Sequence, residues 1–359
     1  MACELFTAKF PSVRLNRLKR FETHFLKINE HRESIMNTQR ALNQLTKMAV
    51  MGLALVSNAY AWQVEPVDVS FSNEDGLVIP GKLFEPQQIA PQQKLPAVVM
   101  MHGCSGIYSR LPNGTYTTNV AQIYREWADR LVGAGYVVLL VDSFSPRGSK
   151  NECNNGAGVG ISEVLDRPKD ALAAYQYLAT QSNWIDIAHI GLLGWSHGAS
   201  ATLSTLATTL ATDGVTASPG ANLKPFKVGV AFYPGCGLSY SDNGTIKTGW
   251  TSITNSKWDS YSPLFIHHGN ADKLYYDSSK STTALQYPCT TRVTKATQIA
   301  GGSTVSMTVY DGAQHSFDDP SQFPGLCDEV TPANTPNQCA KKQADQASMD
   351  VFNQYLKTP

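Results

Sequence analysis

The chain has 359 residues, of which 42% are hydrophobic and 16% are charged, with a mean hydropathy of −0.22. This length is ample for a large buried core, and the composition excludes a disordered chain and a polytopic membrane protein. The 29 basic and 29 acidic residues balance only over the whole chain. Residues 1–61 hold nine basic and four acidic residues, which leaves 20 basic against 25 acidic residues, a net charge of −5, in the remainder. We therefore expect no nucleic-acid partner, because an acidic body binds phosphate backbones poorly.

A targeting signal lies within the first 61 residues. Residues 48–61, MAVMGLALVSNAYA, form an apolar run after Lys47 and end in Ala-Tyr-Ala, which predicts a secretory signal peptide cleaved after Ala61. The run is too short to span a bilayer, so we expect no stable membrane insertion after cleavage. The depth of the signal points to Met36 as the start of translation, with residues 1–35 as an extension. An uncleaved N-terminal membrane anchor is the alternative.

Cysteine usage agrees with export. Only Cys3 precedes Ala61, and the six cysteines that remain are an even number, as an oxidising compartment favours. Their spacing includes no C-x-x-C pair and fits no zinc module. Six cysteines allow fifteen pairings. The strand assignment below favours three disulfides between loops at one sheet edge, and six buried thiols are the alternative. The three pairs are Cys104–Cys153, Cys236–Cys289 and Cys327–Cys339.

Residues 62–359 alternate apolar strands with helical stretches. An antiparallel hairpin is predicted first, where residues 64–71 and 77–84 alternate around a polar turn. Continuous apolar runs, typical of strands buried on both faces, follow it. These six runs are 95–103, 136–143, 189–195, 227–235, 262–270 and 304–312. Helices are predicted at 119–133, 167–180, 199 to about 211, 277–287 and 340–356.

This order of elements predicts an eight-stranded, mainly parallel sheet covered by helices on both faces. No internal repeat or linker interrupts it, so residues 62–359 are expected to form a single domain. The loop 145–166 is rich in glycine and asparagine. We interpret it as an active-site or disulfide-tied loop rather than a domain boundary.

The motif that carries chemistry is Gly194-Trp195-Ser196-His197-Gly198, which fits G-x-S-x-G. A buried strand runs directly into it and a helix follows, as a nucleophile elbow requires. The two glycines leave room for a tight turn that exposes the Ser196 hydroxyl beside the helix N-terminus, where developing negative charge is stabilised. A glycine-rich turn without reactivity is the alternative.

A serine nucleophile needs a base, and the base needs an acid to orient it. In the expected order Ser, acid, His, the chain offers Asp272 after the strand 262–270 and His315 after the strand 304–312. Asp277 and Asp311 are rival acids: Asp277 is predicted to begin a helix, and Asp311 is too near His315 in sequence. The rival histidines are His102, His197, His267 and His268.

Two backbone N–H groups are expected to form the oxyanion hole. One is that of His197, directly after the nucleophile, and the other is that of Cys104, in the loop after the strand 95–103. A Cys104–Cys153 disulfide would keep this loop rigid. The side chains of His102 and His197 are interpreted as structural.

These motifs resemble the dienelactone hydrolase family of α/β-hydrolases. The resemblance implies the α/β-hydrolase fold and hydrolysis of an ester or lactone, with Ser196, Asp272 and His315 in the positions of nucleophile, acid and base. The dienelactone-cleaving enzymes of the family use cysteine as nucleophile and are cytosolic, so Ser196 and the export signal favour a general ester as substrate. The motifs that carry the resemblance are HGCSG at 102–106, VDSF and PRG at 141–148, Arg167 with Asp170, GWSHG, FIHHGNAD and DGAQHSF.

Residues at the expected pocket have weaker signals. Arg147 is a candidate to bind a substrate carboxylate, and an ion pair that holds its loop is the preferred interpretation. Arg167 and Asp170 are expected to form a structural salt bridge. Trp195 and Tyr233 are candidates to line the pocket, although aromatic residues at strand ends usually serve packing.

The sequence thus predicts a secreted or periplasmic serine hydrolase that cleaves small-molecule carboxylic esters or lactones through an acyl-enzyme, without metal or cofactor. A peptidase on the same fold is one alternative, but such peptidases usually carry a propeller domain, for which the chain has no room. A non-catalytic binding protein is the other, but it would be expected to lack a member of the triad, and none is missing. The sequence does not indicate the oligomeric state.

Overall fold

The computed structural model divides the chain into two compact units, Met1–Ala61 and Trp62–Pro359. The described residues all belong to the second unit, so the predicted signal peptide lies outside them. They are residues 64–90, 92–155, 159–208, 223–242, 245–248, 259–275, 289, 293, 303–327 and 334–357. Within this part of the chain, no helix is long and apolar enough to cross a membrane.

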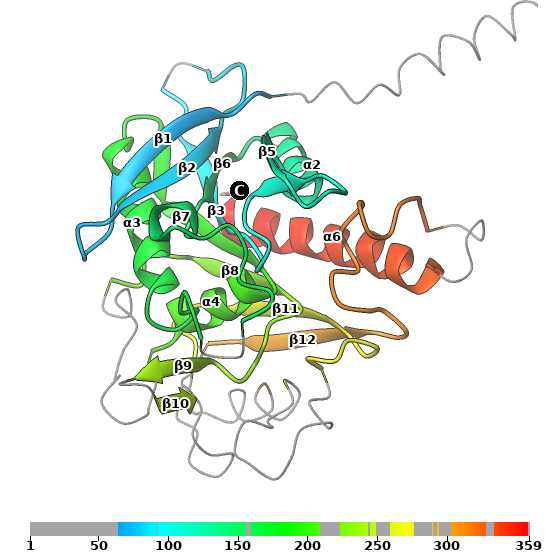
Figure 1. Ribbon diagram of the computed structural model, residues 1–359. Coiled ribbons are helices and arrows are strands. Elements are labelled where there is room, and N and C mark those ends of the chain that lie inside the picture. The colour runs from blue at the N-terminus through cyan, green and yellow to red at the C-terminus, as the bar shows by residue number, and fades with distance from the viewer. Residues whose placement is uncertain are drawn as a thin grey trace, which may run out of the picture. The chain divides into compact units, whose positions relative to one another are not determined.

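The second unit is built on one eight-stranded sheet with the order β1-β2-β6-β3-β7-β8-β11-β12 (Figure 1). β1 and β2 form the predicted antiparallel hairpin, β2 joins β6 antiparallel, and every other neighbouring pair is parallel. The predicted mainly parallel sheet is therefore confirmed. Its strands are β1 (Val67–Ser72), β2 (Val78–Phe84), β3 (Leu95–Met101), β6 (Val137–Val141), β7 (Ile185–Trp195), β8 (Val228–Phe232), β11 (Leu264–Gly269) and β12 (Val305–Tyr310).

Helices follow the strands with two changes from the prediction. α4 ends before residue 211, because Ala207 takes an extended conformation and forms a β-bridge with Ser260. The last helix starts five residues earlier than predicted, with Pro336 in its first turn, a position that suits proline. The helix predicted at 277–287 lies outside the described residues. The helices are α2 (Gln122–Gly133), a 3₁₀ turn η1 (Ser145–Arg147), α3 (Arg167–Thr180), α4 (His197–Leu206) and α6 (Thr335–Leu356).

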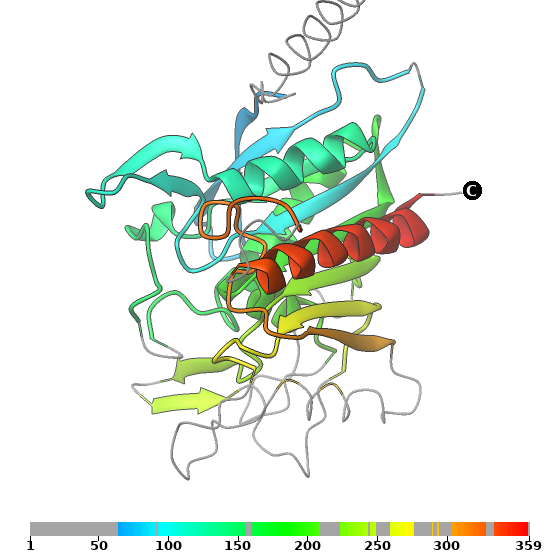
Figure 2. The same ribbon diagram turned by 90° about the vertical axis from the view of Figure 1, so that its right-hand side faces the viewer.

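Two short hairpins were not predicted. β4 (Tyr108–Arg110) pairs with β5 (Tyr116–Val120) between β3 and α2, and β9 (Ser239–Asp242) pairs with β10 (Thr245–Thr248) after β8. Both are antiparallel. The β4–β5 hairpin projects beside the start of α2 (Figure 2). Each hairpin follows the carboxyl end of a core strand, so both extend the loops on which a site in this kind of sheet is built.

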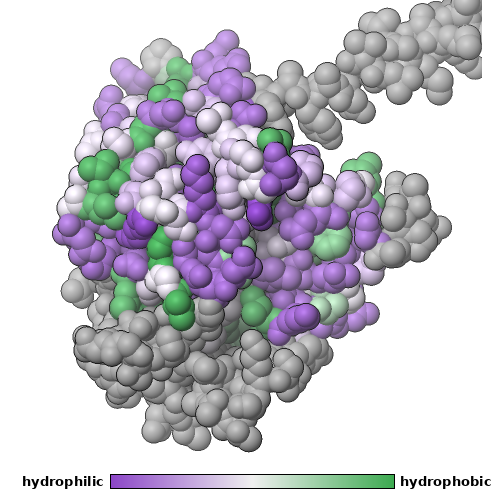
Figure 3. All heavy atoms as spheres, in the orientation of Figure 1, coloured by the Kyte–Doolittle hydropathy of each residue, from purple (hydrophilic) through white to green (hydrophobic). Residues whose placement is uncertain are grey.

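The helices cover both faces of the sheet, as predicted. Alternate residues of β3 point to opposite faces, so Val99 and Met101 join one hydrophobic cluster and Val98 and Met100 join the other. α3 and α4 contribute to the first cluster, and α2 and α6 to the second. Figure 2 shows α2 and α6 lying across the second face. On the described surface seen in Figure 3, hydrophobic residues occur in small groups among hydrophilic ones.

Candidate active site

Ser196 lies at the carboxyl end of β7, directly before α4. Its backbone has φ 50° and ψ −114°, a strained conformation for a residue other than glycine. A Cβ on Gly194 would collide with the Gly198 backbone, and a Cβ on Gly198 would collide with the Met101 carbonyl of β3. Only glycine therefore fits at both ends of this turn, which lifts the Ser196 side chain above the end of the strand.

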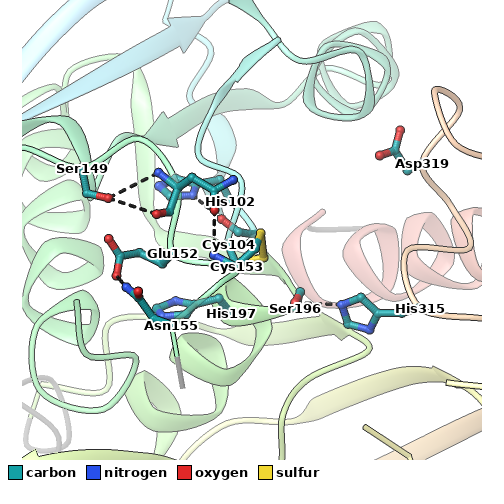
Figure 4. The surroundings of a disulfide bond; sticks show 12 residues. His102, Cys104, Ser149, Glu152, Cys153, Asn155, Ser196, His197, His315 and Asp319 are labelled. Carbon is teal, nitrogen blue, oxygen red and sulfur yellow. Dashed lines mark hydrogen bonds between the residues drawn. A yellow bond between two sulfur atoms is a disulfide. The ribbon is translucent and has the colours of Figure 1, made fainter. Parts of the chain in front are cut away.

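Asp272 and His315 reach Ser196 from two later loops. Asp272 follows β11 and is 2% exposed, whereas the His315 side chain, in the loop after β12, is 35% exposed. His315 Nδ1 lies 2.7 Å from Asp272 Oδ2. His315 Nε2 lies 2.9 Å from Ser196 Oγ, and Figure 4 shows this contact between the two side chains. With Nδ1–H donated to the carboxylate, Nε2 is left to accept the serine proton. The structure thus brings the three predicted residues into one chain of hydrogen bonds.

Asp272 is held in place by its own loop. Its second oxygen, Oδ1, accepts the Leu274 N–H at 2.8 Å. His268 Nδ1 lies 3.7 Å from Asp272 Oδ2, and burial lowers the pKa of His268. Of the rival acids, Asp311 accepts a hydrogen bond from Asn270 at an exposed position, and Asp277 lies outside the described residues. Of the three candidate acids, Asp272 is the one whose carboxylate contacts His315 in the described part of the chain.

The rival histidines are buried and bonded elsewhere. His267 lies between the Tyr310 hydroxyl at 2.9 Å and Ser348 Oγ at 3.1 Å, and burial lowers its pKa to about 4. His268 Nε2 lies 3.3 Å from the Pro234 carbonyl. The side chains of His102 and His197 pack behind the turn that carries Ser196, as described below. None of the four competes with His315 for the serine hydroxyl.

The loop after β3 lies against Ser196. A Cβ built on Gly103 would be 3.7 Å from Ser196 Cβ, and the Gly103 N–H donates to the Tyr124 hydroxyl at 2.8 Å. Cys104 is joined to Cys153 by a disulfide, and its carbonyl accepts the Glu152 N–H at 2.8 Å. His197 is the first residue of α4, whose leading N–H groups have no partner inside the helix. Cys104 and His197 thus lie next to Ser196, one in the loop after β3 and the other at the start of α4.

A cleft of about 910 Å³ opens above these residues. Its floor holds Ser196, Asp272 and His315 together with Cys104 and Cys153. The β4–β5 hairpin, the start of α2 and the loops after β11 and β12 also line the cleft. The aromatic residues that line it are Tyr108, Tyr116, Tyr124, Trp195, Tyr233 and Phe323.

Two of these aromatic residues are fixed by a buried carboxylate that the sequence analysis missed. Asp318 accepts the Trp195 Nε1–H at 2.8 Å and the Tyr233 hydroxyl, and burial raises the pKa of Asp318 to about 6. The Tyr233 ring lies 4.7 Å from the His315 ring, and Tyr233 has φ 42°. Trp195 lines the cleft as the sequence suggested, but it is 1% exposed and mainly packs. The available signal was the position of Asp318, three residues after His315.

Arg147, the tentative candidate to bind a substrate carboxylate, is paired with Asp170 in the structure. Both of its terminal nitrogens donate to Asp170, at 2.7 and 3.0 Å, and Nη1 also donates to the Ser143 carbonyl. It is not among the described residues that line the cleft. The preferred interpretation of Arg147, an ion pair that holds the loop, is the one observed, and the planar guanidinium suits this bidentate geometry. The expected Arg167–Asp170 salt bridge is wrong, since Arg147 takes Asp170.

Arg167 is fully buried and turns instead toward His197. Its Nη1 donates to His197 Nδ1 at 2.9 Å, and Glu163 Oε2 lies 3.6 Å from His197 Nε2. Burial and the neighbouring Arg167 charge lower the pKa of His197 to about 3, so its ring is neutral. Burial raises the pKa of Glu163 to about 8. This cluster lies behind the elbow.

The two remaining predicted cysteine pairs are also joined. Cys236 is bonded to Cys289, and Cys327 to Cys339. All six cysteines of the second unit are thus in disulfides. Within the described part of the chain, no group of three or more His, Cys, Asp or Glu side chains is arranged to hold a metal ion.

Two curated proteins are similar to part of this chain. Mouse and human dipeptidyl peptidase 8 are each 30% identical over 135 residues, or 37% of this chain. The chain spans only 14% of the length of these curated relatives.

Solved structures show the same fold at low identity. A Klebsiella pneumoniae protein provisionally assigned as a dienelactone hydrolase matches 81% of this chain and 99% of its own, with 14% identity and a TM-score of 0.52. Porphyromonas gingivalis dipeptidyl peptidase 4 matches 82% of this chain but only 36% of its own, with 17% identity and a TM-score of 0.51. The model of the dienelactone hydrolase family matches residues 79–356. The chain therefore belongs to the dienelactone hydrolase family.

Proposed function

We propose that this protein is a serine hydrolase that cleaves small-molecule carboxylic esters or lactones through an acyl-enzyme. The single observation that carries the proposal is the continuous hydrogen-bond chain from Asp272 through His315 to Ser196, at 2.7 and 2.9 Å. Membership of a hydrolase family over residues 79–356 supports it. So does the cleft that opens on the Ser196 hydroxyl.

The proposed reaction has two halves. His315 Nε2 removes the Ser196 proton as Oγ attacks the ester carbonyl, while Asp272 stabilises the imidazolium that forms. The N–H groups of Cys104 and His197 donate to the oxyanion of the tetrahedral intermediate. His315 then protonates the departing alcohol oxygen, which leaves the acyl group on Ser196. In the second half His315 removes a proton from water, the hydroxide attacks the acyl carbon, and the Ser196 oxygen leaves with the proton.

Covalent labelling tests the nucleophile. A fluorophosphonate probe is expected to label the wild-type protein and the Ser109→Ala variant but not Ser196→Ala. Ser109 is the matched control because it also lines the cleft, on β4. Folded wild-type protein that stays unlabelled, or label found on another residue, contradicts the proposed mechanism.

A peptidase is the second candidate, favoured by the 30% identity to dipeptidyl peptidase 8 over 135 residues. Ester and amide hydrolysis use the same triad, so the difference lies in leaving group and pocket. Turnover of short acyl nitrophenyl esters is to be compared with that of dipeptidyl nitroanilides. We expect kcat/KM to be higher for the esters and for aryl lactones. Efficient release of nitroaniline from an N-terminal dipeptide would reverse the assignment.

We also propose that the protein is exported and that its signal peptide is cleaved after Ala61. The three disulfides support an oxidising compartment. When the full chain is expressed with an intact export pathway, the protein recovered outside the cytoplasm is expected to begin at Trp62. A cytoplasmic product that retains residues 48–61 would contradict export.

A further inference from the structure

His102 lies directly after β3 and is fully buried, and both of its ring nitrogens form hydrogen bonds with the backbone. Nδ1 lies 2.7 Å from the Gly103 carbonyl, and Nε2 lies 3.3 Å from the Ser143 backbone nitrogen. A backbone N–H can only donate, so Nε2 accepts and Nδ1 carries the proton that is donated to Gly103. Burial, followed by the Arg167 charge, lowers the pKa of His102 well below its ordinary value, which keeps the ring in this neutral form.

The Gly103 carbonyl belongs to the same peptide group as the Cys104 N–H. In a planar trans peptide the C=O and N–H point in opposite directions. A carbonyl held toward the buried His102 ring therefore directs the Cys104 N–H the other way. Cys104 lines the cleft there, and a Cβ on Gly103 would be 3.7 Å from Ser196 Cβ. In the view of Figure 4, Cys104 lies between His102 and Ser196.

All but one of the other restraints on this loop act on groups outside the Gly103–Cys104 peptide. Tyr124 accepts the Gly103 N–H, Glu152 donates to the Cys104 carbonyl, and Cys153 binds the Cys104 sulfur. The Gly106 N–H reaches the Gly103 carbonyl only at 3.3 Å, longer than the 2.7 Å to the imidazole. The imidazole is therefore the shortest contact on the Gly103–Cys104 peptide.

We propose that His102 is a positioning residue for the oxyanion hole: its Nδ1–H holds the Gly103 carbonyl so that the Cys104 N–H faces the reacting carbonyl oxygen. This inference rests on the proposed serine-hydrolase function and extends it to a side chain that does not itself touch substrate. The role needs a hydrogen-bond donor at the position of Nδ1, and not merely a buried ring.

Two amide substitutions separate this role from a purely structural one. In His102→Asn the amide nitrogen stands near the position of Nδ1 and retains the donor to Gly103. In His102→Gln the longer side chain places its amide near Nε2 and retains only the contact with Ser143. His102→Ala removes both contacts. Each variant is assayed for kcat and KM on a nitrophenyl ester, for the rate of fluorophosphonate labelling, and for its melting temperature.

We expect kcat to fall about 10- to 100-fold in His102→Gln and His102→Ala, less than the loss of a whole oxyanion donor, while KM changes little. His102→Asn is expected to recover most of the wild-type kcat. Labelling by the fluorophosphonate should follow kcat, because its phosphoryl oxygen occupies the same hole. If the alanine variant does not fold, the contrast between the asparagine and glutamine variants decides.

The inference would be overturned by a kcat in His102→Gln equal to that of the wild type, by equal losses in the asparagine and glutamine variants, or by a better rescue by glutamine. A loss confined to the melting temperature would assign His102 to stability alone and also overturn it. Failure of the proposed function has a different signature, since the wild-type protein itself would then show neither ester turnover nor labelling at Ser196.

Discussion

An acid–histidine pair stands on each side of Ser196, and the two pairs differ in almost every physical respect. On the cleft side, Asp272 Oδ2 lies 2.7 Å from His315 Nδ1, and the His315 side chain is 35% exposed. Behind the elbow, Glu163 Oε2 lies 3.6 Å from His197 Nε2, and the Arg167 guanidinium donates a hydrogen bond to His197 Nδ1. Burial raises the pKa of Glu163 to about 8, and burial with the Arg167 charge lowers that of His197 to about 3.

The contrast between the two pairs shows that a carboxylate beside a histidine is not enough to make that histidine a catalytic base. A base needs a free nitrogen directed at the nucleophile and enough solvent access to carry a positive charge during the reaction. His315 meets both conditions through Nε2 at 2.9 Å from Ser196 Oγ. The His197 ring meets neither, because Arg167 donates to it and burial disfavours its charged form.

The largest loss of kcat is expected when Ser196 or His315, the proposed nucleophile and base, is replaced by alanine. Ser196→Ala and His315→Ala should each lower kcat by about 10⁶-fold, because serine and base act as a unit. For the same reason the double variant should be little worse than either single one. Steady-state kinetics on a nitrophenyl ester measure all three. Losses that multiply in the double variant would show that the two residues act independently.

The two carboxylates give a matched test of the comparison. Asp272→Asn keeps the shape but reverses the hydrogen-bond preference at His315, and kcat should fall about 10⁴-fold. Glu163→Gln makes the same chemical change behind the elbow, where the carboxyl pKa of about 8 already favours the neutral form at pH 7, and kcat should fall less than about tenfold. Equal losses in the two variants would end the distinction between the pairs.

The disulfide beside the buried pair provides a test on stability. Cys104–Cys153 closes 49 residues and Cys327–Cys339 closes 12. Loop-closure entropy then gives a loss of about 4 kcal/mol in unfolding free energy for the double alanine variant of the first pair and about 3 kcal/mol for the second. Denaturant unfolding under non-reducing conditions measures both. A smaller loss for the longer loop would contradict the entropic account of these disulfides.

The smallest effect concerns the pH dependence of stability. A folded-state pKa raised from 4.5 to about 8 means that the folded protein holds the Glu163 proton over a range in which the unfolded chain has lost it. The unfolding free energy of the wild type should therefore fall, relative to Glu163→Gln, as pH rises from about 4.5 to 8. Denaturant titrations across this range compare the two proteins. Parallel curves would show that Glu163 ionises normally in the folded state.

Much of this site was accessible from the sequence, because parallel strands bring their carboxyl ends to one edge. Once 189–195, 262–270 and 304–312 were assigned as parallel strands, Ser196, Asp272 and His315, which each follow one of them, were expected at that same edge. The three cysteine pairs were predicted from the same assignment, although Cys339 lies in α6 and not in a loop.

The parts that sequence could not supply depend on where side chains turn. Arg167 and Asp170 are three apart at the start of α3, a spacing that suggests an ion pair, yet Arg147 reaches Asp170 from the η1 turn. That approach depends on the path of the loop after β6. The β4–β5 hairpin was missed because Tyr108–Arg110 is only three residues long, with no clear alternation. The role of Asp318 depends on two aromatic partners far away in sequence.

The β4–β5 hairpin contributes to the cleft but not to the sheet that positions Ser196, Asp272 and His315. It lines the cleft but lies between β3 and α2, outside the eight-stranded sheet that fixes the reacting groups. We therefore expect exchanges on the cleft side of this hairpin to change substrate preference more than the geometry of Ser196, His315 and Asp272. Substrate preference and reaction chemistry would then depend on two different parts of the chain.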